Sequence, residues 1–333
     1  MKSESSRARR GARWASIACA LALLASCGGG DLVTAFAPRR IVAFGDETSA
    51  LTTAGQVDPV TQQAYDATGK NWGVNAVDST SGALVCQNDP NWVQYLAQSW
   101  GLPFPQCNPN GGSAPSIDHA ANGATVDGVS AQIDAHLAAD TLSDKDLVTL
   151  LVGANDILAQ YALYDGSNEA ALSAALEERG SALAGLVHRL VAAGGKVIVL
   201  TVPDLGVTPF ALTEKAAHTD TDRAALLTRL TDRFNAKLRV GLVNDSGRDV
   251  GLVLGDQVIQ FYAKFPAAGG FVDVIDPLCT QAPPNCTTAT LDTTKSVTPG
   301  AFSWLWATPT LLSAGGQRQL GIAADSRSRN NPF

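Results

Sequence analysis

The sequence predicts an α/β protein with a mainly parallel sheet, because buried strands alternate with amphipathic helices. Apolar runs of strand length occur at 147–152 and 197–202, and a long alanine-rich amphipathic stretch, 169–193, lies between them. Continuous apolar strands of this kind are typical of parallel sheets that are covered on both faces. We therefore expect a three-layer α/β/α sandwich.

Shorter segments extend this pattern along the chain. The first strand is expected at 41–44, and Gly45 and Asp46 end it in a tight turn. Residues 55–90 are rich in Gly, Thr, Asn and Asp and predict an irregular excursion. Periodic segments also predict helices at 91–100, 129–138 and 224–242 and a strand at 250–254. About 290 residues remain after the N-terminal segment, which is enough for one domain with a large core.

The turn after the first strand is where an open α/β sheet places ligands and chemistry. The sequence there reads Phe44-Gly45-Asp46-Glu47. It resembles the first block of the GDSL or SGNH family of ester hydrolases, Phe-Gly-Asp-Ser-Leu-Ser-Asp, in which the first serine is the nucleophile. Aligned without gaps, that serine falls on Glu47, and Ser49 matches only the second serine. The resemblance implies the flavodoxin-like fold of that family.

Two further segments resemble family blocks that build the oxyanion hole, the donors that stabilise the negative oxygen of the transition state. Gly123 lies in a small-residue turn and matches the glycine whose backbone N–H points into the hole. A Gly-Ala-Asn-Asp run follows the 147–152 strand and matches the family's Gly-x-Asn-Asp block. This match places Asn155 at the side-chain amide donor. The resemblance extends over 41–324.

The last family block, Asp-x-x-His followed by Pro-Thr, is altered in this chain. Trp304 and Pro309 fix the alignment and place Leu305 at the aspartate and Thr308 at the histidine. A serine nucleophile needs a base to take its proton and a carboxylate to orient that base. Leucine and threonine supply neither group. All three triad positions are therefore replaced, by Glu47, Leu305 and Thr308.

These replacements favour a catalytically degenerate member of the family that acts as a binding or accessory protein. In its most specific form, the hypothesis places the Glu47 carboxylate in the retained hole, where it accepts hydrogen bonds from the Gly123 N–H and the Asn155 amide. Another interpretation is a structural protein of the cell envelope without a ligand. It predicts a closed site, whereas a binding protein would keep an open one.

The enzymatic alternative is an active hydrolase that acts on carboxylic esters or acylated glycans through a non-standard site. One version uses Ser49 as nucleophile and His119 as base, because His119 is the one histidine close to a site block. The other version uses Glu47 with Asp46 as an acid and base pair.

The first residues resemble an export signal. Basic residues at 7–13 precede an apolar stretch, 14–25, that is too short for a permanent membrane span. The stretch ends in Leu-Ala-Ser-Cys, which resembles the bacterial lipoprotein cleavage box and marks Cys27 for acylation. An ordinary secretory signal with a chance cysteine is the alternative. By resemblance to sorted lipoproteins, Gly28 after this cysteine favours the outer membrane of a bacterial envelope.

The chain is thus expected to have four parts. These are the signal peptide 1–26, the lipidated cysteine and tether 27–40, an SGNH hydrolase-like domain 41–326, and a C-terminal tail 327–333. Residues 1–26 hold five of the 24 basic and one of the 31 acidic residues, which leaves 19 against 30 and a net charge of −11. This charge argues against nucleic acid and against attraction to anionic lipid, so the expected membrane link is the anchor alone.

Four cysteines remain after Cys19 and Cys27 are set aside, an even number in a chain predicted to be exported. Of the three possible pairings we favour the two local ones, Cys86–Cys107 and Cys279–Cys286. A metal site is the rival interpretation, but the spacings lack a Cys-x-x-Cys pair and no histidine lies near them. We expect no metal and no cofactor, and an acyl group or a glycan as the possible ligand.

Overall fold

The computed structural model describes residues 35–243 and 249–330, and the fold is given for those residues. The expected export signal, the acylation site at Cys27 and most of the tether lie outside the described residues. In the described part of the chain, no helix combines the length and the apolar character that a membrane span requires.

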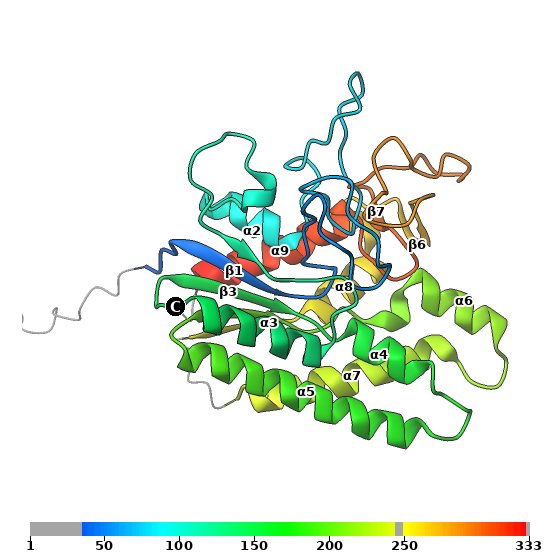
Figure 1. The fold of residues 1–333 in the computed structure, drawn as a ribbon. Coiled ribbons are helices and arrows are strands. Elements are labelled where there is room, and N and C mark those ends of the chain that lie inside the picture. The colour runs from blue at the N-terminus through cyan, green and yellow to red at the C-terminus, as the bar shows by residue number, and fades with distance from the viewer. Residues whose placement is uncertain (1–34, 244–248, 331–333) are drawn as a thin grey trace, which may run out of the picture. The chain divides into compact units, whose positions relative to one another are not determined.

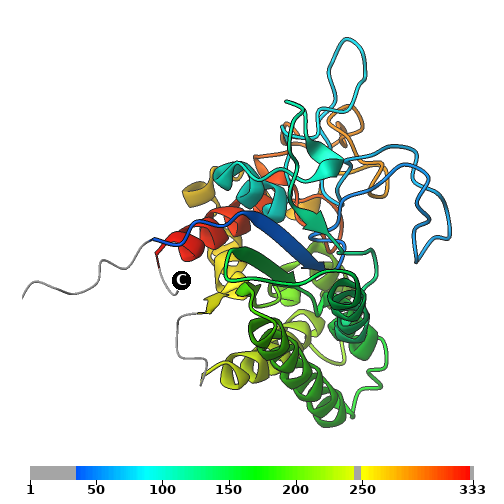
Figure 2. The ribbon, with the colours of Figure 1, turned by 60° about the vertical axis from the view of Figure 1, so that its left-hand side comes forward.

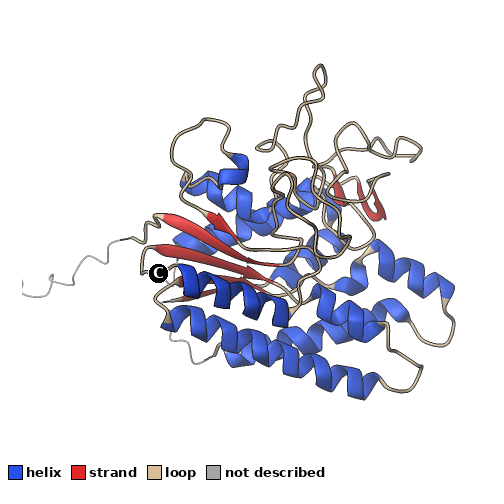
Figure 3. Ribbon diagram, in the orientation of Figure 1, coloured by secondary structure: helices blue, strands red, loops and turns tan. Residues whose placement is uncertain are grey.

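Within the described residues, five parallel strands form the central sheet in the order β2-β1-β3-β4-β5 (Figures 1 and 3). They are β1 (Arg40–Gly45), β2 (Ile117–Asp118), β3 (Asp146–Leu151), β4 (Lys196–Leu200) and β5 (Val250–Val253). This is the flavodoxin-like strand order, in which the chain direction switches beside β1 and ligands bind at the carboxyl ends of the strands. The predicted fold class is confirmed.

The strands are apolar throughout because both faces of the sheet are buried. Successive side chains of a strand point to opposite faces. In β1, Val42 and Phe44 belong to one core cluster, whereas Ile41 and Ala43 belong to the cluster on the other face. Every residue of β3 is buried as well. The central strands are therefore held by burial on two sides, which fixes the position of the turns that follow them.

Helices cover both faces of the sheet (Figure 2). The cluster that contains Phe44 is covered by α3 (Val126–Ala139), α4 (Ala154–Tyr161), α5 (Glu169–Ala192), α6 (Pro209–Ala217) and α7 (Arg223–Gly241). The opposite cluster is covered by α2 (Trp92–Trp100), α8 (Gly255–Lys264) and α9 (Ala314–Arg329). Short 3-10 helices occur at Pro105–Cys107, Leu205–Val207 and Pro266–Gly269.

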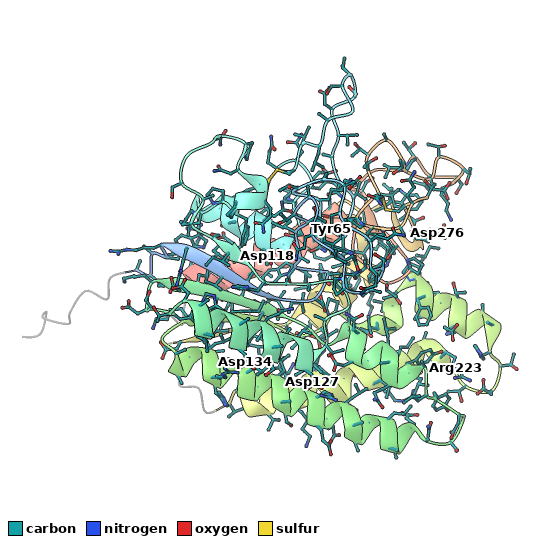
Figure 4. The ribbon with its side chains drawn as sticks, viewed as in Figure 1. Tyr65, Asp118, Asp127, Asp134, Arg223 and Asp276 are labelled. Carbon is teal, nitrogen blue, oxygen red and sulfur yellow. A yellow bond between two sulfur atoms is a disulfide. The ribbon has the colours of Figure 1, made fainter. Side chains whose placement is uncertain are left out.

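Ion pairs join α3 to α5 on the outer surface. Asp127 and Asp134 both project from α3, as Figure 4 shows, and they pair with Arg179 at 2.6 Å and Arg189 at 2.5 Å. All four side chains are exposed, so each pair contributes little, at most about 1 kcal/mol. The stability of this layer comes mainly from its apolar contacts.

Long loops at the carboxyl ends of the strands enclose a third, smaller core cluster around Trp304 and Cys286. A two-stranded parallel pair, β6 (Asp273–Pro277) and β7 (Trp304–Trp306), lies beside it. Both expected disulfides, Cys86–Cys107 and Cys279–Cys286, are present, and they close loops in this region. The irregular excursion predicted for 55–90 is also observed, because isolated bridges are its only regular pairing within the described chain.

Several boundaries and elements differ from the expectation. Helix α3 starts at Val126 rather than 129, because the Thr125 side chain caps it by accepting from the Gly128 N–H. Helix α9 continues to Arg329, so the expected tail at 327 starts three residues too early. Elements that were not predicted from sequence are β2, α4, α6, α8, α9, β6 and β7.

Candidate functional site: the first turn and its oxyanion donors

The turn after β1 lies against the end of β3, since the two strands are adjacent and parallel. Gly45 at the end of β1 pairs with Leu151 at the end of β3. A Cβ atom on Gly45 would lie 2.4 Å from the Leu151 carbonyl oxygen, and its φ is +153°, so only glycine fits this close approach. This geometry brings the side chains that follow the two strands together at one edge of the sheet.

Glu47 occupies the centre of this edge. Its Oε2 atom accepts a hydrogen bond from the Gly123 backbone N–H at 3.0 Å and another from the Asn155 side-chain amide at 2.9 Å. The amide of Asn155 also donates to the Ala124 carbonyl at 3.1 Å, which fixes its orientation. The hydrogen bonds expected of Glu47 are therefore present, and one carboxylate oxygen satisfies both donors.

Two other carboxyl groups lie close to Glu47. Asp46 is fully buried and accepts from the Thr48 N–H at 2.9 Å, and burial together with the neighbouring charge of Glu47 raises its pKa well above the ordinary value. Asp156 accepts from the Val126 N–H at 3.0 Å, and burial raises its pKa too. Both shifts favour the protonated form, which limits the negative charge gathered around the Glu47 carboxylate.

A loop from the irregular excursion covers Gly123. Asp58 accepts from the Asn122 amide at 2.9 Å, from the Val60 N–H at 2.7 Å and from the Tyr65 hydroxyl at 3.1 Å. Figure 4 shows Tyr65 among these loops. Gly123 has a φ of +73°, and a Cβ atom there would lie 2.4 Å from the Val60 side chain. Asp58 thus ties the 58–61 turn against the Gly123 turn.

The last block also reaches this edge of the sheet, but the residues at its two expected triad positions have structural roles. Leu305 is fully buried in the core cluster on the α9 side of the sheet. The Thr308 hydroxyl accepts from the Leu311 N–H at 2.9 Å and from the Thr310 N–H at 3.3 Å, so it closes a local turn. One side chain therefore stabilises the core and the other a loop.

Ser49 and His119, the residues of one enzymatic alternative, have separate partners. The Ser49 hydroxyl is fully buried and accepts from the Trp92 indole N–H at 3.0 Å. His119 shares a 2.9 Å hydrogen bond with His136 and stacks on Phe44, with 5.2 Å between the ring centroids. Burial, and secondly the charge of His136, lower the pKa of His119 to about 4. The two residues do not form a nucleophile and base pair.

The cavity beside Glu47 is small. It has a volume of about 30 Å³ and lies between the first turn and the last block, with Glu47, Ala154, Leu158, Trp306 and Leu311 among its lining residues. One or two water molecules fill such a space. Ligand pockets of roughly 300–1,000 Å³ accommodate drug-sized molecules. The site therefore has the closed form expected of a protein that binds no ligand there.

Sequence reasoning missed three features of this region. One is the burial of His136, which belongs to α3 and packs at 2% exposure against His119 and Phe44. The cover of Gly123 by Val60 and the bond from Trp92 to Ser49 were also missed. His119 follows β2 and His136 lies on α3, and the two are 17 residues apart in the chain. They meet only through the tertiary fold, so no periodicity in the sequence indicates their contact. Within the described residues, no group of three or more His, Cys, Asp or Glu is placed to hold a metal ion.

The parallel sheet, the turn after β1, and the Gly123 and Asn155 donors around it define the class of α/β proteins with an esterase-like site. The model of the GDSL-like Lipase/Acylhydrolase family matches residues 43–244, more than half of the chain. The chain belongs to this family. The match includes the turns of Glu47, Gly123 and Asn155, and it ends before the last block.

Several solved structures are similar to this chain over most of its length. An acetylxylan esterase from Geobacillus stearothermophilus has 13% identity and a TM-score of 0.47, over 89% of this chain and 97% of that one. An α/β hydrolase from the metagenome of Lake Arreo, Spain, has 14% identity and a TM-score of 0.44, over 88% and 96%. A lipolytic G-D-S-L family protein from Veillonella parvula has 12% identity and a TM-score of 0.40, over 86% and 95%. No curated protein matches the chain.

Proposed function

We propose that this chain is an exported, lipid-anchored member of the GDSL family whose hydrolase site is catalytically inactive. It acts as a binding or accessory protein of the cell envelope. The observation that carries the proposal is the position of one Glu47 oxygen, which accepts from both the Gly123 N–H and the Asn155 amide. These are the donors that a substrate's oxyanion would need.

The Glu47 carboxylate competes directly with a substrate for these donors. Hydrogen bonds to a charged group contribute about 1.5–3 kcal/mol, more than bonds to a neutral ester carbonyl. At the positions that align with the orienting acid and the base of the family, the sequence has Leu305 and Thr308. Without a nucleophile and base, a hydrolase site retains only about 10³–10⁴-fold acceleration over water. Such a rate does not support a dedicated esterase.

The closed form of the site limits where a ligand can bind. A cavity of about 30 Å³ beside Glu47 has no room for an acyl chain or a sugar ring. By the criterion given with the sequence, the closed site favours an accessory or structural role over ligand binding at the first turn, and any ligand must occupy another surface of the domain. The loss of catalysis therefore depends on the residues of the first turn, whereas ligand binding depends on residues elsewhere in the domain.

Anchoring is proposed from the sequence alone. The Leu-Ala-Ser-Cys box places an acylated cysteine at Cys27, and Gly28 after it favours the outer membrane. Growth with labelled palmitate tests this step. The wild-type chain should carry label and sediment with membranes, whereas Cys27→Ser should lose the label. Label on the Cys27→Ser protein would contradict anchoring through Cys27.

The loss of hydrolysis is tested on the purified chain with short-chain nitrophenyl esters and a panel of acylated glycans. We expect no turnover above the background of the buffer. Turnover that is abolished by Glu47→Gln or by Ser49→Ala would overturn the proposal in favour of a non-standard hydrolase. Exposed Glu178, on the outer surface of α5, provides a matched control as Glu178→Gln.

A further inference from the structure

We propose that the groove between α8 and α9 is a binding site for a long-chain fatty acid, with Arg327 as the partner of the carboxylate. This α8–α9 groove has a volume of about 630 Å³, some twentyfold larger than the cavity beside Glu47. It lies at the β5 edge of the sheet, outside the family site. The proposal does not depend on the loss of hydrolysis at Glu47.

The walls of the groove are mostly aliphatic and aromatic. Its apolar lining comes from the end of β5, from α8 and from α9, and includes Leu252, Leu254, Val258, Phe261, Ile322 and Ala323. Phe261 is 48% exposed and Ile322 is 39% exposed, so water contacts large apolar side chains at the rim. A linear hydrocarbon chain would remove this surface from water, at about 25 cal/mol for each Å² buried.

The charged group of the groove is a single arginine. Arg327 is exposed on the last turns of α9, and in the part of the chain that the structure describes it forms no ion pair. The acidic residue closest to it in sequence, Asp325, already accepts from Ser99 and Arg329. Among the described residues, no Asp or Glu lines the groove. The guanidinium group is therefore available to a ligand, and it binds a carboxylate with two parallel hydrogen bonds.

The charge of the chain favours one small anionic molecule, rather than an anionic membrane surface, as the partner of the groove. The chain after residue 26 has a net charge of −11, which repels an anionic membrane as a whole. One carboxylate next to one free arginine is a local interaction and is compatible with that charge. The remaining polar lining residues, Gln257, Gln319, Ser326 and Asn330, are neutral, so they add no second cationic partner for a larger headgroup.

The Arg327 end of the groove lies at the end of the domain where the described chain starts. Phe36 packs edge-on against Trp100, and the Arg329 guanidinium lies over the same indole, 3.8 Å from its centroid. Cys27 precedes Phe36 by nine residues in the sequence. The lipid anchor proposed above therefore joins the domain at the end where α9 finishes, and the membrane is a source of fatty acids.

The test is a titration of the full chain, carrying Cys27→Ser so that no anchor competes, with the fluorescent fatty acid cis-parinaric acid. We expect saturable binding of one molecule per chain. Arg327→Glu and Ile322→Asp should each weaken it at least tenfold, which corresponds to about 1.4 kcal/mol. Arg318→Glu, exposed on the same helix, and Val240→Asp, exposed on α7, lie outside the groove and should bind within twofold of the unmodified chain.

Competition identifies the ligand. Palmitate should displace the probe, whereas hexadecanol, which has the same chain without the charge, should compete at least tenfold more weakly. Equal competition by hexadecanol would show that Arg327 takes no part and would overturn the carboxylate assignment. Stronger competition by lysophosphatidylcholine would overturn the fatty-acid assignment. Absence of saturable binding, or equal losses in the two control variants, would overturn the site itself.

Discussion

The carboxylate of Glu47 lies 2.9 Å from the side-chain amide of Asn155, two residues that are 108 positions apart in the chain. The adjacent parallel strands β1 and β3 bring them together, because each residue follows the carboxyl end of its strand. The same Glu47 oxygen binds the Gly123 N–H. Glu47 therefore joins three segments of the sheet edge through two partly buried hydrogen bonds to one oxygen.

This interaction should be measurable as stability. Glu47→Ala removes the acceptor of two donors, and we expect the free energy of unfolding to fall by about 1.5–3 kcal/mol. Urea unfolding of the purified chain measures the change. Exposed Glu178→Ala on α5 serves as the control and should stay within about 0.5 kcal/mol of the wild type. A Glu47→Ala protein as stable as the wild type would mean that water replaces the carboxylate without loss.

Restoring the serine alone should not restore hydrolysis. Glu47→Ser supplies a hydroxyl group, but Leu305 is buried in the core and the Thr308 hydroxyl accepts two backbone N–H groups, so no base activates the serine. We expect the Glu47→Ser rate on p-nitrophenyl acetate to stay within tenfold of the wild-type rate. A larger increase would reveal a base that these contacts do not identify.

The sequence predicted the parts of the fold that have a strong period. The apolar runs that became β3 and β4, and the long helix α5, were expected within one or two residues, because burial of both sheet faces demands continuous apolar strands. Helix α9 was missed because its first turn contains Gly315-Gly316 and it ends in a polar Ser-Arg run, so its composition gives little helical signal.

The candidate site was predictable where the sequence resembles the family blocks. Glu47 follows the first strand, and the resemblance assigned Gly123 and Asn155 to the oxyanion hole beside that turn, so their meeting was expected. Val60 and Trp92, which cover Gly123 and hold Ser49, come from an aperiodic loop and from a helix after it. Their positions depend on tertiary contacts such as the Asp58 bonds, and local sequence does not encode those contacts.

His119 should contribute an acid-sensitive part of the stability, which opposes the contribution of the buried carboxyl groups of Asp46 and Asp156 with their raised pKa. The folded-state pKa of His119 is lowered to about 4, mainly by burial, whereas an unfolded histidine titrates near 6.5. Between these values the unfolded chain binds more protons, so the stabilisation that is present above pH 6.5 is lost as the pH falls towards 4. After a discount for partial exposure, we expect a loss of roughly 2 kcal/mol.

Urea unfolding at a series of pH values between 7 and 4.5 measures this dependence. His119→Asn should lose less stability than the wild type between pH 7 and 4.5, whereas His218→Asn, at an exposed position, should follow the wild-type curve. An unchanged slope in His119→Asn would assign the acid sensitivity to other groups. His136, whose pKa is also lowered by burial, would then be the next residue to replace.

The two disulfides should stabilise the protein to different degrees. Cys86–Cys107 spans 21 residues and Cys279–Cys286 spans 7. The loss of loop-closure entropy in the unfolded chain predicts about 3.4 kcal/mol for the longer loop and about 2.5 kcal/mol for the shorter one. Double alanine variants of each pair, compared by urea unfolding, measure both. A larger loss for the shorter loop would mean that packing of buried Cys286 against Trp304 outweighs loop closure.

The contact between Gly123 and Val60 should make the effects of substitutions at these two residues on the free energy of unfolding non-additive. Gly123→Ala introduces a Cβ atom 2.4 Å from the Val60 side chain, at a φ of +73°, and we expect it to lower the free energy of unfolding by about 2 kcal/mol or more. Val60 is 60% exposed, so Val60→Ala alone should change stability by less than about 0.5 kcal/mol. In the double variant the clash is absent and only the backbone strain remains. The double-mutant cycle should therefore give a coupling of at least 0.5 kcal/mol, and additive losses would show that the 58–61 turn does not cover Gly123 in solution.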